Sequence, residues 1–185
     1  INPTPNILQI LCQLKIWEVQ NKILHDQNYD EALNILKEFT DQYMIESPHL
    51  LSFVYQKAIQ YKSIEWCNYC LSLAYSYSSI SNEWKNQVES LLAQLYLNNG
   101  EPEKAIKLVS ILPDSIHKHF LEIKCIILLY PEDKSLKEKL ISFISETSEE
   151  RTVLVALCLF VADHCEVIEN AAIKFIKEVM KISHS

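Results

Sequence analysis

Apolar residues recur at steps of three and four along almost the whole chain, which is the spacing of helices that bury one face. In the first such segment, Ile7, Leu8, Leu11 and Leu14 follow this pattern. Polar breaks and prolines separate the segments, because Pro is tolerated in the first turn of a helix but not in its interior. The pattern predicts ten helices, over about residues 6–24, 30–43, 48–60, 63–77, 83–99, 102–112, 115–130, 135–145, 152–163 and 166–182.

The clearest helix boundary lies at Gly100, the only glycine of the chain. Glycine readily takes the left-handed conformation that ends many helices, and Pro102 suits the first turn of the next helix. Ser47, which precedes a proline, is another predicted helix start, and Ser135 with Glu138 forms a capping-box pattern. The scarcity of glycine favours helices over a turn-rich β-protein.

The hairpin around Gly100 carries large and small residues in the order Leu92, Ala93, Tyr96, Gly100 and Ala105. This order resembles that of the tetratricopeptide repeat, a pair of antiparallel helices with a period of about 34 residues. The small-residue position of each second helix recurs, with two departures from the usual Ala, at Ala32, Cys67, Ala105, Leu140 and Ala171. We therefore expect an all-α fold, an α-solenoid of about five antiparallel helix pairs, as one domain over residues 1–185 of a longer protein.

Charge and composition exclude several classes of partner. The net charge of −7 is spread over both halves of the chain, so no basic surface for nucleic acid is expected. The longest apolar run, residues 153–162, is too short to cross a bilayer, and the start of the chain lacks a signal-peptide pattern. Six cysteines, mostly within apolar helical patterns, favour a reduced, intracellular protein. We predict that the partners are other proteins, with no cofactor and no small-molecule substrate.

Few residues carry catalytic or metal-binding patterns. Cys67 and Cys70 have the spacing of metal ligands, but they lie inside a predicted helix without a second pair at finger-like distance. The remaining candidates are the pairs His117 with His119 and His164 with Cys165. A chain with one glycine cannot form a Gly-rich phosphate loop, and the common hydrolase motifs are absent from the sequence. We predict no metal site and no enzymatic activity, with an enzyme built on an α-solenoid as the alternative.

Two surfaces are candidates for protein binding. In stacked helix pairs the ligand usually lies on the concave surface lined by the first helix of each pair. In the best-defined repeat, the positions expected there are Gln87, Ser90, Gln94, Leu97 and Asn98. They are mostly neutral, which disfavours the carboxylate-clamp mode by which some such repeats hold chaperone C-termini. The second candidate is the helix at 152–163, which is apolar on all sides and should leave an uncovered end face at Leu157 and Val161.

The order and spacing of three segments point to a particular family. These segments are Trp66–Leu73, then Gln94–Asn98 with Glu103–Ala105, then Val161–Ala162 with Ala171–Phe175. Together they resemble the meiotic crossover scaffolds of the Spo-twenty-two/Zip-four class, called testis-expressed protein eleven in mammals. The resemblance implies a non-enzymatic nuclear scaffold that joins crossover-promoting and synaptonemal-complex proteins on meiotic chromosomes. A general cytoplasmic or nuclear adaptor, for example a subunit of a ubiquitin-ligase or trafficking assembly, would have the same helices and is the alternative.

Overall fold

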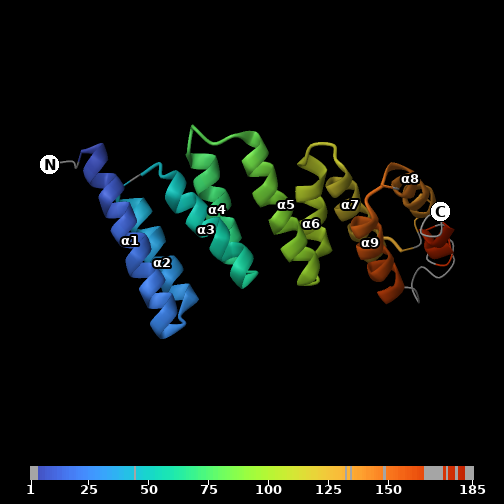
Figure 1. Ribbon diagram of the computed structural model, residues 1–185, viewed down its shortest axis with the longest axis horizontal. Coiled ribbons are helices and arrows are strands. Elements are labelled where there is room, and N and C mark those ends of the chain that lie inside the picture. Colours follow the sequence, from blue (N-terminus) through green and yellow to red (C-terminus); the bar gives the residue numbers. More distant parts are fainter. Residues whose placement is uncertain are drawn as a thin grey trace. The chain divides into compact units, whose positions relative to one another are not determined.

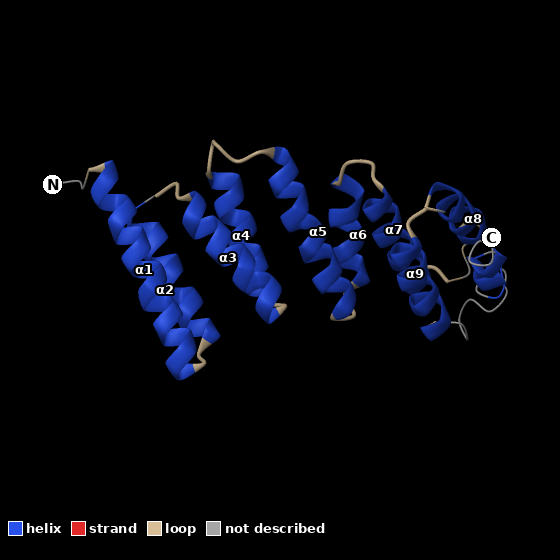
Figure 2. Cartoon of the chain, in the orientation of Figure 1, coloured by secondary structure: helices blue, strands red, loops and turns tan. Residues whose placement is uncertain are grey.

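The computed structural model describes residues 4–43, 45–131, 133, 135–147, 149–164, 173, 175–177 and 179–181. Every regular element within these residues is an α-helix, as Figures 1 and 2 show. The helices are α1 (Pro5–Asp26), α2 (Tyr29–Tyr43), α3 (Pro48–Tyr61), α4 (Ile64–Ser76), α5 (Asn82–Asn98), α6 (Pro102–Ile111), α7 (Ile116–Leu129), α8 (Leu136–Glu146) and α9 (Arg151–Asp163).

The observed helices match the predicted segments closely. Each of the first nine predicted segments contains one helix, and the ends agree to within two residues. The tenth segment, 166–182, lies largely outside the described residues, as does Ala171, although residues 175–177 and 179–181 are helical. The prediction of an all-α fold built from paired helices is confirmed.

The chain divides into two compact units, Ile1–Leu91 and Leu92–Ser185, with the boundary inside α5. In the first unit, α1 packs against α2 and α3, and α3 packs against α4. In the second unit, α7 packs against α6, α8 and α9. The single domain over residues 1–185 stays a prediction.

Small side chains mark the close helix contacts of the first unit. Ala32, Ala58, Cys67 and Ala74 are all completely buried. Trp66 is the largest buried side chain, and its ring meets the edges of neighbouring aromatic rings, with centroid distances of 6.4 Å to Phe53 and 5.9 Å to Tyr61. Small residues let the helix backbones approach, and large residues fill the space between them.

Helix α7 contributes to two hydrophobic cores formed by described residues of the second unit. One core joins it to α5 and α6 through Ala93, Leu97, Ala105, Val109, Leu121 and Cys125. The other core joins it to α8 and α9, and includes Ile123, Ile126, Ile127, Leu140, Phe143, Leu154, Leu157 and Val161. Because neighbours surround it, α7 buries side chains around most of its circumference.

Local signals set most of the helix ends. Gly100 has a φ of 72°, and its N–H donates to the Leu97 carbonyl at 3.1 Å while the Glu101 N–H donates to the Tyr96 carbonyl at 2.9 Å. These two bonds form a Schellman motif, as Gly100 predicted. Ser47 caps α3, since its Oγ accepts from the Leu50 N–H at 3.3 Å.

The capping box predicted at Ser135 is wrong. Ser135 already has helical backbone angles (φ −76°, ψ −16°), whereas a capping residue usually has an extended conformation. Its N–H instead donates to Asp133 Oδ1 at 2.8 Å. At the start of α8, the side chain of Asp133 and not that of Ser135 therefore accepts a backbone N–H.

The buried position of Ala105 gives a test of the central helix contact. We expect Ala105→Trp to lower the free energy of unfolding by about 1–3 kcal/mol or more, because the added ring cannot fit beside Ala93 and Val109. Urea denaturation of purified protein measures this change. Lys107→Trp, at an exposed position of the same helix, is the control and should leave stability nearly unchanged. Equal stability of the two variants would contradict the described packing.

Candidate functional site

The five predicted groove positions of α5 divide into two groups. Gln87 and Asn98 are exposed and Gln94 is half-buried, whereas Ser90 and Leu97 are buried. A helix turns by about 100° per residue, so Gln87, Gln94 and Asn98 lie within about 40° of one another. Measured from Gln87, Ser90 lies about 60° and Leu97 about 80° around the helix by the same geometry. The prediction that Ser90 and Leu97 face a groove is therefore wrong.

Gln94 connects α5 to a lysine on α7 that sequence reasoning missed. Lys124 Nζ donates to Gln94 Oε1 at 3.3 Å, and Gln94 Nε2 donates to Asn98 Oδ1 at 2.8 Å. The structure therefore places two of the predicted residues, Gln94 and Asn98, in one hydrogen-bonded row with Lys124. All three residues belong to the second unit.

Two aromatic rings flank the Lys124 ammonium group. Its Nζ lies 5.1 Å from the ring centroid of Phe120, one turn earlier on α7, and 4.7 Å from that of Phe160 on α9. Both distances are within the range of cation–π attraction. We call Lys124, Gln94, Asn98, Phe120 and Phe160 the lysine cluster. It combines side chains from α5, α7 and α9.

The Lys124 side chain is buried, with 9% of the residue exposed. Burial lowers its pKa, since the charged form loses water. Within the described part of the chain, no carboxylate lies close enough to form an ion pair with it. A buried ammonium held only by an amide and two rings is costly, and such groups concentrate at functional sites. The available signal was the position of Lys124 within an otherwise apolar stretch of α7.

His117 lies at the edge of the lysine cluster. Its ring stacks near Phe120, with 6.4 Å between centroids. Partial burial and, second, the charge of Lys124 lower the pKa of His117. A change in the charge around Lys124 should therefore change the pKa of His117.

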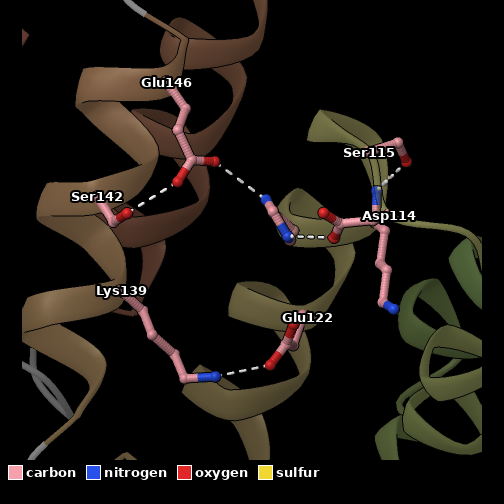
Figure 3. Close-up of polar contacts among 8 residues, drawn as sticks. Asp114, Ser115, Glu122, Lys139, Ser142 and Glu146 are labelled. Carbon is pink, nitrogen blue, oxygen red and sulfur yellow. Dashed lines mark hydrogen bonds and ion pairs between the residues drawn. The ribbon is translucent and has the colours of Figure 1, made fainter.

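A second polar group ties α7 to α8, and Figure 3 shows it. Lys139 Nζ on α8 lies 2.6 Å from Glu122 Oε1 on α7, beside a cavity of about 170 Å³ that both residues line. The two ring nitrogens of His119 lie 2.9 Å from Asp114 Oδ1 and 3.1 Å from Glu146 Oε2. A protonated imidazole donates to both carboxylates, whereas a neutral one donates to only one. Lys139 is therefore paired with a carboxylate, in contrast to Lys124.

The arrangement in Figure 3 does not form a nucleophilic site. Ser142 Oγ donates to Glu146 Oε1 at 2.8 Å, so the hydroxyl is directed at a carboxylate and not at His119. Activation of a serine nucleophile needs its hydroxyl next to a base such as imidazole. The contacts therefore support a structural tie between the two helices.

Cys67 and Cys70 are core thiols. Cys67 Sγ donates to the Val88 carbonyl at 3.6 Å, and Cys70 Sγ donates to the Leu51 carbonyl at 3.9 Å. Burial raises the pKa of Cys67 to about 12 and also raises the pKa of Cys70. Among the described residues, no three potential metal-ligating side chains converge. Cys165 lies outside those residues.

The predicted end face on α9 requires a correction. Leu157 and Val161 are completely buried in the core shared with α7 and α8. The large apolar residues of α9 that are exposed are instead Val155 and Leu159. The sequence could not distinguish them, because α9 is apolar on every side and periodicity then gives no direction.

The fold and the lysine cluster define an all-α protein of paired helices with a buried, unpaired cation among its described residues. Comparison with known proteins found no matching family model, no matching curated protein and no matching solved structure. Within the residues that the structure describes, no helix combines the length and apolar character needed to span a membrane.

The burial of Leu157 and the exposure of Leu159 predict opposite results for the same substitution at the two positions. Leu157→Glu should lower the free energy of unfolding by about 3 kcal/mol or more, because it buries an unpaired charge. Leu159→Glu, at an exposed position, should change it by about 0.5 kcal/mol or less. Thermal melts followed by circular dichroism compare the two. A similar loss in both variants would mean that Leu159 is also a core residue.

The buried thiols predict the absence of bound zinc. Purified protein should contain no stoichiometric metal, since the raised thiol pKa values disfavour the thiolates that zinc requires. In a thiol titration, Cys67 and Cys70 should react only after denaturation. Elemental analysis that found one zinc per chain, lost in Cys67→Ser, would contradict this expectation.

Proposed function

We propose that this chain is a non-enzymatic protein-binding scaffold, and that Lys124 anchors a carboxylate group of a partner protein. The observation that carries the proposal is the buried Lys124 ammonium, which lacks a carboxylate partner among the described residues. A carboxylate from a partner would supply the missing opposite charge. In a partly desolvated site this attraction is stronger than at an exposed surface.

The neighbours of Lys124 suit this ligand. Gln94 and Asn98 carry amide groups that can donate additional hydrogen bonds to a carboxylate or a peptide carbonyl. Phe120 and Phe160 can contact the apolar part of a peptide while they limit access of water. The neutral α5 positions alone argued against carboxylate binding, but Lys124 supplies the cation from α7. We therefore propose carboxylate binding at this site, although the α5 positions alone disfavoured it.

Stability measurements provide the first test. Replacing Lys124 with Met keeps most of the side-chain volume and removes the buried charge, so we expect the free energy of unfolding to rise by about 1 kcal/mol or more. Lys107→Met, at an exposed position of the same unit, is the control and should have little effect. A large loss of stability in Lys124→Met would indicate a structural role instead.

Binding measurements provide the second test. The probes are pooled synthetic peptides, each made with a free or an amidated C-terminus, and with acidic or amide side chains. We expect peptides with carboxylates to bind, and Lys124→Met to weaken binding by about 30-fold or more. The amidated and amide-substituted peptides distinguish a C-terminal carboxylate from an acidic side chain. Carboxylate-independent binding, or unchanged binding by Lys124→Met, would contradict the proposal.

The pH titration of His117 is an independent measurement on the same site. Since the charge of Lys124 lowers the pKa of His117, a bound carboxylate should raise that pKa. NMR titration of His117 with and without a bound peptide measures the change. An unchanged His117 pKa with a carboxylate peptide bound would place the ligand elsewhere.

The biological setting stays a proposal. The meiotic crossover role is supported by the resemblance of segments whose described residues include the buried Trp66, Cys67 and Ala105. These are packing positions, which an adaptor in another assembly would share. Affinity capture with this chain from meiotic and from mitotically dividing cells, read by mass spectrometry, distinguishes the two settings. Capture of crossover proteins that Lys124→Met loses would support the meiotic role.

A further inference from the structure

Helix α1 exposes a row of large apolar side chains that its own unit leaves uncovered. The row consists of Ile7, Ile10, Leu14, Trp17 and Leu24, which are between 48% and 74% exposed. Asn21, which is half-buried, lies in the same row between Trp17 and Leu24. We call these six residues the α1 stripe. Figure 1 shows α1 as the first helix of the chain.

The opposite side of α1 accounts for its attachment to the first unit. Cys12, Val19 and Ile23 are buried there, and Cys12 Sγ donates to Ser47 Oγ at 3.3 Å. The helix is therefore apolar on two sides, although only one side is needed for packing against α2 and α3. Contiguous exposed apolar patches on a folded protein often mark interaction surfaces.

The spacing of the α1 stripe identifies the kind of surface that fits it. Its residues follow one another by steps of three and four, so they occupy the a and d positions of three consecutive heptads. An average step of 3.5 residues keeps a seam facing one partner helix along its length. The occupant that this pattern fits is therefore another α-helix that carries a similar seam.

The charges of α1 favour a partner with the same composition. Lys15 pairs with Glu18 at 2.7 Å, and Lys22 pairs with Asp26 at 3.5 Å and with Glu31 at 2.8 Å. The helix is thus locally neutral although the chain carries −7. A strongly charged partner helix would find few unpaired charges here, whereas two copies of α1, each without net charge, would meet without like-charge repulsion between the helices.

The polar rim of the stripe is also self-complementary. On one edge it carries Asn6, Gln13 and Gln20, whose amide groups both donate and accept hydrogen bonds. Asn21 occupies an a position, where a single Asn can pair with its copy and fix the register of two helices. Trp17 adds a large central side chain of the kind that dominates protein interfaces.

We propose that the α1 stripe pairs with the α1 stripe of a second copy of this chain. The interface is isologous, since the same surface is used on both copies. It lies on the first unit and does not depend on the carboxylate site of the second unit. The proposed dimer interface and the lysine cluster therefore belong to different units of the chain.

Sedimentation equilibrium of the purified chain at micromolar concentrations tests the proposal. We expect a reversible dimer, which Leu14→Glu and Trp17→Glu each weaken by at least about tenfold, because two acidic groups then face each other in the seam. Both positions are exposed, so circular dichroism should show unchanged helix content and nearly unchanged melting of the monomeric unit.

The matched control is Ile59→Glu, which changes an exposed apolar residue of α3 outside the stripe. It should leave the dimer intact. A wild-type chain that stays monomeric throughout the concentration range would overturn the proposal. So would a dimer that resists both stripe variants, or one that Ile59→Glu weakens equally, since either result would place the contact elsewhere.

Discussion

The close approach of paired helices at small buried side chains is the contact on which both units depend. Ala32 and Cys67 in the first unit, and Ala105 in the second, are completely buried. A larger side chain at these points would hold the helix backbones apart, and the neighbouring large residues could no longer fill the space. Trp66 in the first unit shows the complementary part of this arrangement, because its buried ring fills space beside Phe53 and Tyr61.

The central place of α7 explains why a lysine became buried. Helix α7 packs against α6, α8 and α9, so few of its positions can reach solvent. Lys124 lies on one of the enclosed sides, between Phe120 and Phe160, where its charge costs stability. Apolar residues of similar volume would satisfy the packing alone. A binding role would require a cation at this position in spite of its cost in stability. Such a trade-off between stability and function is common at functional sites.

The two polar groups of the second unit differ in whether their lysine is paired with a carboxylate. Glu122 with Lys139, and His119 with Asp114 and Glu146, satisfy one another and join α7 to neighbouring segments. Lys124 is charged and buried without such a partner among the described residues. The α1 stripe is the apolar counterpart, a regularly spaced surface whose large side chains are exposed. In each case we propose that the unsatisfied group takes part in an intermolecular contact.

The sequence by itself determined the helices, because their signals lie within a few neighbouring residues. Periodicity placed nine helices, Gly100 ended α5, and Ser47 capped α3. Tertiary structure alone decided which face of α9 is buried, because every side of this helix is apolar. Packing against α7 and α8 buries Leu157 and leaves Leu159 exposed. It also decided the lysine cluster, since Gln94, Lys124 and Phe160 come from three helices. A one-dimensional pattern fixes which residues share a helix face, but only the packed helices determine which faces meet.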